Sequence, residues 1–268
     1  MARYETMFSQ LDAKNEGAFV PFVMLGDPDR ATSIKIVQTL IDNGADALEL
    51  GFPYSDPIAD GPTIQAASIR ALDNGNTPGE CLEIIAQIRH DNPEIPIGLL
   101  LYSNLVLARG IEHFYAQAKA SGVDSILIAD VPLREAQRFI DVAKAYEIDQ
   151  ILIAPPNATE ETLTAIGKLS SGYTYLLGRA GVTGAETAAE TPASELIEKL
   201  AQYKVAPPLL GFGISTPEQV AHAIASGAAG AISGSATVNI IAKYLDDTPT
   251  MLQSLGEFVH NMKAGTAK

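Results

Sequence analysis

Short apolar runs recur eight times along the chain, and segments with helical spacing separate them. The helical spacing is clear where Ile34, Val37 and Ile41 follow one another at steps of three and four residues. The apolar runs begin at residues 18, 46, 95, 124, 149, 173, 208 and 229 and read AFVPFVML, DALELG, IPIGLLLY, DSILIAD, DQILIA, YTYLLG, PLLGFG and AGAISG. Strands that alternate with helices form a parallel sheet, and eight such units close into a barrel. We therefore expect residues 1–268 to form a single (β/α)8 TIM-barrel domain.

The main alternative is a doubly wound sheet of six strands. A dinucleotide-binding sheet of this kind carries GxGxxG directly after its first strand, and no such motif follows the run that ends at Leu25. The gaps after the second and sixth runs are the longest in the chain. Because the loops after the strands of a barrel form the end that holds the active site, we expect extended functional loops after strands 2 and 6.

The two ends of the chain carry further helical patterns. Tyr4, Phe8 and Leu11 predict an N-terminal capping helix that plugs the bottom of the barrel, and apolar residues from Leu252 to Met262 predict a closing helix. The last five residues, AGTAK, are expected to fray.

Composition narrows the class of function. A net charge of −14 disfavours nucleic acid and anionic membranes as partners, because both require a basic surface. No apolar run approaches the length of a spanning helix, and Met1 to Asn15 lacks the apolar centre of a signal peptide, so a cytoplasmic protein is expected. The single cysteine, Cys81, lies among apolar residues of a predicted helix and is interpreted as a packed side chain.

Glu49 is the first candidate for catalysis. If Leu48 and Leu50 of strand 2 face the surrounding helices, alternation points Ala47, Glu49 and Gly51 at the barrel axis. A carboxyl in apolar surroundings has a raised pKa and can both take and return a proton. An ion-paired residue at the strand end is the alternative.

Asp60 is the second candidate, in the segment IADGPT that follows strand 2. Asp-Gly is a turn signal and Pro62 fits the first position of a helix, so a capping or turn role competes with a chemical one. The neighbouring residues Asp56 and Pro57 are interpreted as a stiff exposed loop that contacts a partner.

Glycine-rich turns follow the last two strands: GFGIST begins at residue 211 and GAISGSATV at residue 230. Glycines allow the backbone to approach an anion, and the amides at a helix start bind it without a lysine. The pair therefore predicts a phosphate site, although barrel corners also use small residues. Every lysine lies outside the predicted strands and the four histidines lack metal-ligand spacing, which leaves acid–base chemistry without a metal or cofactor in this chain.

The segments LELGFPYSDPIADGPTIQ, GRAGVTGAE, GFGIST and GAISGSA resemble the α subunit of tryptophan synthase, and the resemblance covers essentially the whole chain. It implies cleavage of indole-3-glycerol phosphate to indole and glyceraldehyde 3-phosphate. It also implies transfer of indole to a β subunit that carries pyridoxal phosphate, in an α2β2 tetramer.

The same resemblance implies roles for individual residues. Glu49 matches the acid/base residue, Asp60 the carboxylate that accepts the indole N–H, and Tyr175 a tyrosine beside Glu49. The matching positions for the substrate pocket, the phosphate contacts and a mobile loop are Phe22, Leu100, Tyr102, Ala129, Ile153, Thr183, Gly184, Phe212, Gly213, Gly234 and Ser235. The expected partner contacts are Tyr54, Asp56, Pro57, Asn104 and Pro132.

Two other functions stay open on the sequence. A phosphosugar isomerase or epimerase on a similar barrel could also use two carboxylates, and a regulatory subunit without activity could keep the same fold.

Overall fold

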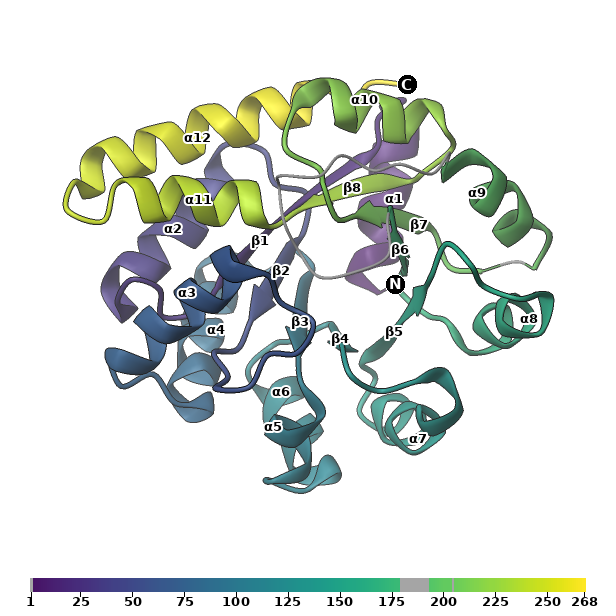
Figure 1. Ribbon diagram of the computed structural model, residues 1–268, viewed down its shortest axis with the longest axis horizontal. Coiled ribbons are helices and arrows are strands. Elements are labelled where there is room, and N and C mark those ends of the chain that lie inside the picture. Colours follow the sequence, from purple (N-terminus) through teal and green to yellow (C-terminus); the bar gives the residue numbers. More distant parts are fainter. Residues whose placement is uncertain (1, 179–192, 204) are drawn as a thin grey trace.

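The computed structural model describes residues 2–178, 193–203 and 205–268 and contains a closed barrel of eight parallel strands (Figure 1). The strands are β1 (Ala18–Met24), β2 (Leu48–Gly51), β3 (Ile97–Leu101), β4 (Ser125–Ile128), β5 (Asp149–Ala154), β6 (Thr174–Leu177), β7 (Pro208–Gly211) and β8 (Gly230–Ser233). Each strand pairs with the next, and β8 returns to β1 with Ala18 opposite Gly230. All eight strands lie within the predicted apolar runs, so the barrel is confirmed.

Helices surround the strands, as crossover connections in a parallel barrel require. They are α1 (Arg3–Ala13), α2 (Arg30–Asp42), α3 (Pro62–Asp73), α4 (Pro78–Asp91), α5 (Ser103–Leu107), α6 (Ile111–Ala120), the 3-10 helix η1 (Leu133–Glu135), α7 (Gln137–Ala145), α8 (Glu160–Leu169), α9 (Ala193–Gln202), α10 (Pro217–Ala225), α11 (Ser235–Lys243) and α12 (Thr248–Ala264). No helix in the described part of the chain is both long and apolar enough to cross a membrane.

Two apolar layers follow from the alternation of side chains along the strands. Leu48 and Leu50 of β2 pack outward in a large cluster with the surrounding helices, whereas Ala47 faces the barrel interior. The interior cluster also contains Tyr4 and Leu11 of α1, so the prediction that the N-terminal helix plugs the barrel is confirmed. Cys81 is fully buried in α4 within the outer layer, and burial raises the pKa of its thiol to about 12, as expected of a packed side chain.

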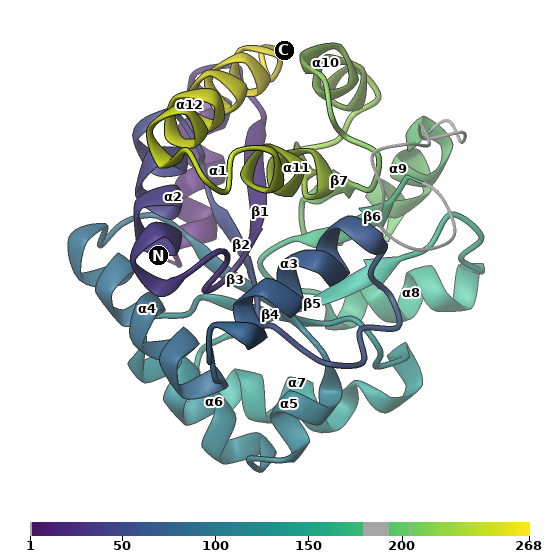
Figure 2. The same ribbon diagram turned by 60° about the vertical axis from the view of Figure 1, so that its left-hand side comes forward.

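The connection after β2 is longer than the others because it contains a loop and two long helices, α3 of 12 residues and α4 of 14. A loop over residues 52–61 leads into α3, and α4 then makes the crossover to β3. In Figure 2, α3 lies with α11 on the near side of the strands, at the carboxyl end of the barrel. The extended loop predicted after strand 6 falls mostly at residues 179–192, which lie outside the described residues.

The end of the chain is tied to the start of β1, so the prediction that residues 264–268 fray is wrong. Gly17 donates its backbone N–H to the carbonyl of Thr266, and Lys268 donates its own to Asn15. The Lys268 ammonium lies 2.6 Å from the Asp12 carboxylate. These bonds satisfy backbone groups that a frayed terminus would leave to water.

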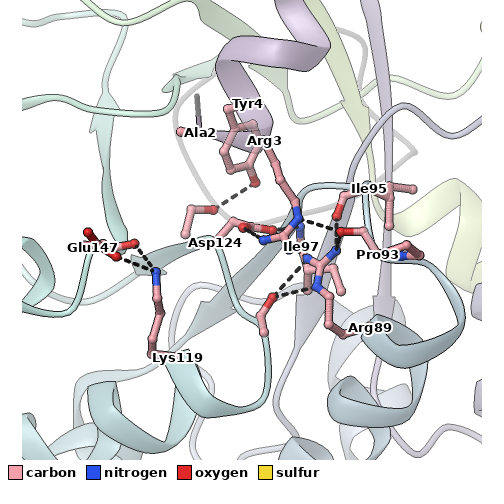
Figure 3. A network of polar contacts seen from close by, with 12 residues as sticks. Ala2, Arg3, Tyr4, Arg89, Pro93, Ile95, Ile97, Lys119, Asp124 and Glu147 are labelled. Atoms are coloured by element: carbon pink, nitrogen blue, oxygen red, sulfur yellow. Dashed lines mark hydrogen bonds and ion pairs between the residues drawn. The ribbon is translucent and has the colours of Figure 1, made fainter.

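Carboxylates at the amino ends of the strands bind backbone amides of the preceding strands. Asp46 accepts the amide of Phe19, and Asp124 accepts that of Ile97, each across 27 residues of sequence. Asp124 is the centre of the network in Figure 3 because it also lies 2.7 Å from the guanidinium groups of both Arg3 and Arg89. One carboxylate therefore joins α1, β3, β4 and α4 at the bottom of the barrel.

We predict that Asp124→Ala lowers the free energy of unfolding by about 3 kcal/mol, because it leaves a largely buried Arg89 and the Ile97 amide without their partner. Urea unfolding measures the loss. Glu147→Gln is the control: the Glu147 carboxylate pairs with Lys119 at 3.5 Å but is 86% exposed, so its removal should have no measurable effect. Equal stability of the two variants would contradict this role of Asp124.

Candidate active site

A pocket opens at the carboxyl end of the barrel, where side chains from the interior meet the loops after β2, β7 and β8. It brings together Glu49 and Asp60, which are close in sequence but lie on a strand and on the following loop. The residues that line it are Phe22, Glu49, Asp60, Ile64, Leu100, Tyr175, Phe212, Gly213, Ile214, Ile232, Gly234, Ser235 and Ala236. Apart from the two carboxyls, the Tyr175 phenol and the Ser235 hydroxyl, the described side chains that line the pocket are apolar.

Glu49 points into the barrel, as alternation along β2 predicts. Its side chain is buried, opposite Phe22 of β1 and Gly98 of β3. Burial raises the pKa of the Glu49 carboxyl to about 7, against the opposing effect of a hydrogen bond from Tyr173. Both the protonated and the ionised form are therefore accessible near neutral pH, so the group can act as an acid or as a base.

Tyr173 is a site residue that sequence reasoning missed. Its hydroxyl donates a hydrogen bond of 3.0 Å to Oε1 of Glu49 across 124 residues of sequence. The Tyr173 ring packs against that of Tyr4 in α1, with centroids 5.5 Å apart, and the Tyr4 hydroxyl bonds Ser125. Gly98 makes room for this arrangement, because a Cβ there would lie 2.9 Å from the Tyr4 hydroxyl. The N-terminal plug thus supports the carboxyl from below.

Tyr175, the predicted neighbour of Glu49, lines the same pocket. Burial raises the pKa of its phenol well above the ordinary value, and the charges of Glu49 and Asp60 raise it further. The phenol is therefore neutral at physiological pH. Gly211 of β7 leaves the space that its hydroxyl occupies, since a Cβ at this glycine would lie 2.1 Å from the oxygen.

Asp60 is buried at the end of the loop that follows β2. Burial raises the pKa of its carboxyl to about 6, and a hydrogen bond with Tyr102 opposes the shift. The Tyr102 oxygen also accepts the amide of Ala59 at 3.1 Å. Because Gly61 occupies the cap of α3 and Pro62 its first position, the Asp60 carboxyl is not at the cap, which weakens the capping alternative.

The turns after β7 and β8 form another part of the pocket wall. Phe212 and Gly213 both have positive φ angles, 66° and 79°, and the first of these is unusual for a residue with a side chain. Gly234 caps α11, and Ser235 and Ala236 at the start of the helix line the pocket. The first amides of a helix lack partners within it and bind anions. The described lining residues include no Lys or Arg, so an anion here would bind mainly to backbone amides.

The remaining predicted residues take other places. Ala129 and Ile153 pack against the interior cluster and are not among the described lining residues. Thr183 and Gly184 lie outside the described residues. Ile64, Ile214 and Ile232 line the pocket although nothing in the sequence distinguishes them from ordinary core residues. Within the described ranges, no three His, Cys, Asp or Glu side chains are grouped to hold a metal ion.

The predicted partner residues lie beside the site on neighbouring loops. Asp56, Asn104 and Pro132 are exposed, whereas Tyr54 and Pro57 are partly exposed. Asn104 donates a hydrogen bond of 2.8 Å to the Tyr54 hydroxyl, and the Tyr54 ring stacks on that of Tyr102 with centroids 5.3 Å apart. Contacts thus lead from the exposed loops to Asp60.

Known proteins resemble this chain over its full length. The family model described as tryptophan synthase alpha chain matches residues 8–267. A tryptophan synthase alpha chain of Shewanella oneidensis is 59% identical over 99% of this chain and 95% of its own length. That of Vibrio parahaemolyticus is 58% identical over all of both chains.

Solved structures with a similar fold also carry the name tryptophan synthase. Tryptophan synthase subunit alpha of Legionella pneumophila has a TM-score of 0.88 at 29% identity and covers 99% of this chain and 98% of its own. A chain of the tryptophan synthase complex of Pyrococcus furiosus has a TM-score of 0.83 at 34% identity, over 92% of this chain and 98% of that chain. On the family match and the full-length identities, this chain belongs to the tryptophan synthase alpha chain family.

Proposed function

We propose that Glu49 and Asp60 are the reacting carboxyls with which this chain cleaves indole-3-glycerol phosphate to indole and glyceraldehyde 3-phosphate. The chain is a lyase of tryptophan biosynthesis by its family. The observation that carries the residue assignment is that two buried carboxyls with raised pKa values face one apolar pocket.

The pocket suits the two chemically different ends of this substrate. Phe22, Ile64 and Leu100 offer apolar surface for an indole ring, and the start of α11 offers backbone amides for a phosphate. A substrate that spans the pocket would place its ring near the carboxyls and its phosphate at Gly234 and Ser235.

The proposed reaction needs one proton in and one proton out. Protonation of carbon 3 of the indole ring makes the ring an electron sink, and Asp60 stabilises the positive charge at the ring nitrogen. Glu49 takes the proton from the hydroxyl next to the ring, the carbon–carbon bond breaks, and its electron pair returns to the ring. A carboxyl with a pKa of about 7 can serve both proton transfers.

We further propose that a tryptophan synthase β subunit with bound pyridoxal phosphate docks on the loops around Asp56, Pro57, Asn104 and Pro132, in an α2β2 tetramer. Support comes from the exposure of Asp56, Asn104 and Pro132, the partial exposure of Pro57, and Ile58, which is 76% exposed on the same loop. The contacts Asn104 to Tyr54 and Tyr54 to Tyr102 give docking a physical route to Asp60.

Glu49→Gln should lower the rate of indole release by roughly 10² to 10⁴, because an amide cannot transfer protons. The same variant should melt a few degrees higher at pH 8. Since the folded-state pKa of Glu49 is raised from 4.5 to about 7, wild type holds a desolvated carboxylate above pH 7, and the difference should shrink as the pH falls towards 5. Glu147→Gln, the same change on an exposed side chain, should alter neither property. Normal turnover by Glu49→Gln would exclude this role.

Gly234→Ala should weaken the binding of glycerol phosphate by about tenfold, roughly 1.4 kcal/mol, and that of free indole far less. The added Cβ would lie 3.8 Å from the Phe22 side chain, an ordinary contact, so the fold should tolerate it. Gly213, with its φ of 79°, is less suitable because any side chain there strains the backbone. The binding of free indole can be followed by its own fluorescence, because the chain has no Trp that would interfere. Gly79→Ala, which also adds an unobstructed Cβ, is the control. Equal loss for both ligands would contradict a phosphate site.

Added β subunit should raise the rate of cleavage between about 5-fold and 150-fold, the range of common allosteric couplings. The double variant Asp56→Ala, Pro57→Ala should lose most of this increase while it keeps the rate of the isolated chain. Gln253→Ala, an exposed amide on α12, should respond like wild type. A full response by the double variant would exclude this loop as the docking surface.

A further inference from the structure

A buried ion pair outside the pocket joins α3 to the loop between β1 and α2. Arg70 of α3 donates Nε and Nη2 to the two carboxylate oxygens of Asp27, at 2.7 and 2.8 Å. The Asp27 side chain is fully buried and that of Arg70 is 21% exposed. A two-pronged pair of this kind fixes direction as well as distance, because the guanidinium is planar and rigid.

Two amide side chains strengthen the same junction. Just beyond α3, Asn74 donates to the carbonyl of Pro28 at 2.5 Å and Asn76 donates to that of Gly26 at 3.2 Å. Gly26 has a φ of 81°, and a Cβ there would collide with the Asn76 amide. The C-terminal end of α3 is thus held to the loop between β1 and α2 by four hydrogen bonds from three side chains.

The opposite end of α3 belongs to the pocket. Asp60 lies two residues before the helix, and Gln65 in the first turns donates to the Asp60 carbonyl at 2.7 Å. Ile64 lines the pocket beside Asp60. A helix is a rigid rod of about 1.5 Å per residue, so a rotation or shift at one end of these three turns moves the other.

Apolar packing alone gives α3 a weak hold. Its buried face offers Ile64 and the small residues Ala67 and Ala71 to Phe22, Met24 and Val238, while Ile69 is 58% exposed. Small side chains provide few contacts that resist sliding. Among the described residues, the two-pronged ion pair is therefore the strongest directional restraint on α3, a helix that lies outside the strand and crossover helix of the barrel repeat.

We propose that Arg70 and Asp27 are positioning residues that hold α3, and through it Asp60, in the geometry that the reaction needs. The inference rests on the proposed function of Asp60. Displacement of a reacting group by about 1 Å can cost as much as 10²-fold in rate, so a partly loosened α3 should cost about tenfold.

The test compares Arg70→Gln and Arg70→Lys with wild type by indole release at 25 °C, by melting temperature and by binding of glycerol phosphate. Arg70→Gln should lower kcat about tenfold and leave glycerol phosphate binding within about twofold, since the start of α11 is unchanged. Arg70→Lys keeps the positive charge but cannot form the two-pronged hydrogen bond, so its kcat should lie between those of wild type and Arg70→Gln. If Arg70→Gln does not fold, the double variant Asp27→Asn, Arg70→Gln removes both charges and takes its place.

Two controls separate positioning from stability. Arg89→Gln removes a comparably buried pair at the barrel bottom (Figure 3), so it should lower the melting temperature without lowering kcat. In an Asp60→Asn background, Arg70→Gln should lower the rate less than about twofold. A residue that acts only by positioning the Asp60 carboxylate has no further effect once that carboxylate is removed.

The inference is overturned if Arg70→Gln keeps wild-type kcat, if Arg89→Gln loses as much kcat, or if the tenfold loss persists in the Asp60→Asn background. Failure of the wild-type chain to release indole, alone and with β subunit, would instead overturn the proposed function and the inference with it.

Discussion

The desolvation of one carboxyl inside a closed barrel is the constraint on which the rest of the site depends. Positions that face the axis of a small parallel barrel are filled by side chains and closed to water. At Glu49 that position holds an ionisable group whose single described hydrogen bond comes from a phenol. A lysine partner would hold its pKa low; without one, burial dominates and brings the pKa to about 7. The proton affinity that acid–base chemistry needs is thus a product of the fold.

The second carboxyl, that of Asp60, is held in place differently, because it lies on a loop outside the repeating strand and helix units of the barrel. Glu49 is held by strand pairing on both sides, to β1 and β3. Asp60 lies on an inserted segment and depends on Tyr102, the turn before α3 and the attachment of α3 itself. The site therefore joins Glu49, which the barrel fixes, to Asp60, whose position can respond to its surroundings. The exposed segments that contain Tyr54 and Asn104 connect to Asp60 through Tyr102.

Much of this arrangement could be predicted from the sequence because it follows from local periodicity. Apolar runs located all eight strands, and alternation in β2 pointed Glu49 inward. The contact of Tyr173 with Glu49 could not be predicted in this way, because it crosses the barrel from the residue before β6 to β2 and periodicity does not specify which inward residues meet. Ile64 and Ile232 were missed because an aliphatic pocket wall has the same pattern as a core. The fixed C-terminus was missed because its partners, Asp12, Asn15 and Gly17, are at the other end of the sequence.

If a phosphate binds to backbone amides at the start of α11, as proposed above, the charge of the chain affects how a phosphorylated substrate reaches the pocket. The chain carries a net charge of −14, and the described residues that line the pocket include no cation to offset it. At long range the protein and a phosphate dianion therefore repel each other, and attraction begins only within a few ångströms of the start of α11. Dissolved salt shortens the reach of the repulsion more than it weakens the close contact. Capture should thus become faster as ionic strength rises, the reverse of enzymes that steer their substrates by charge.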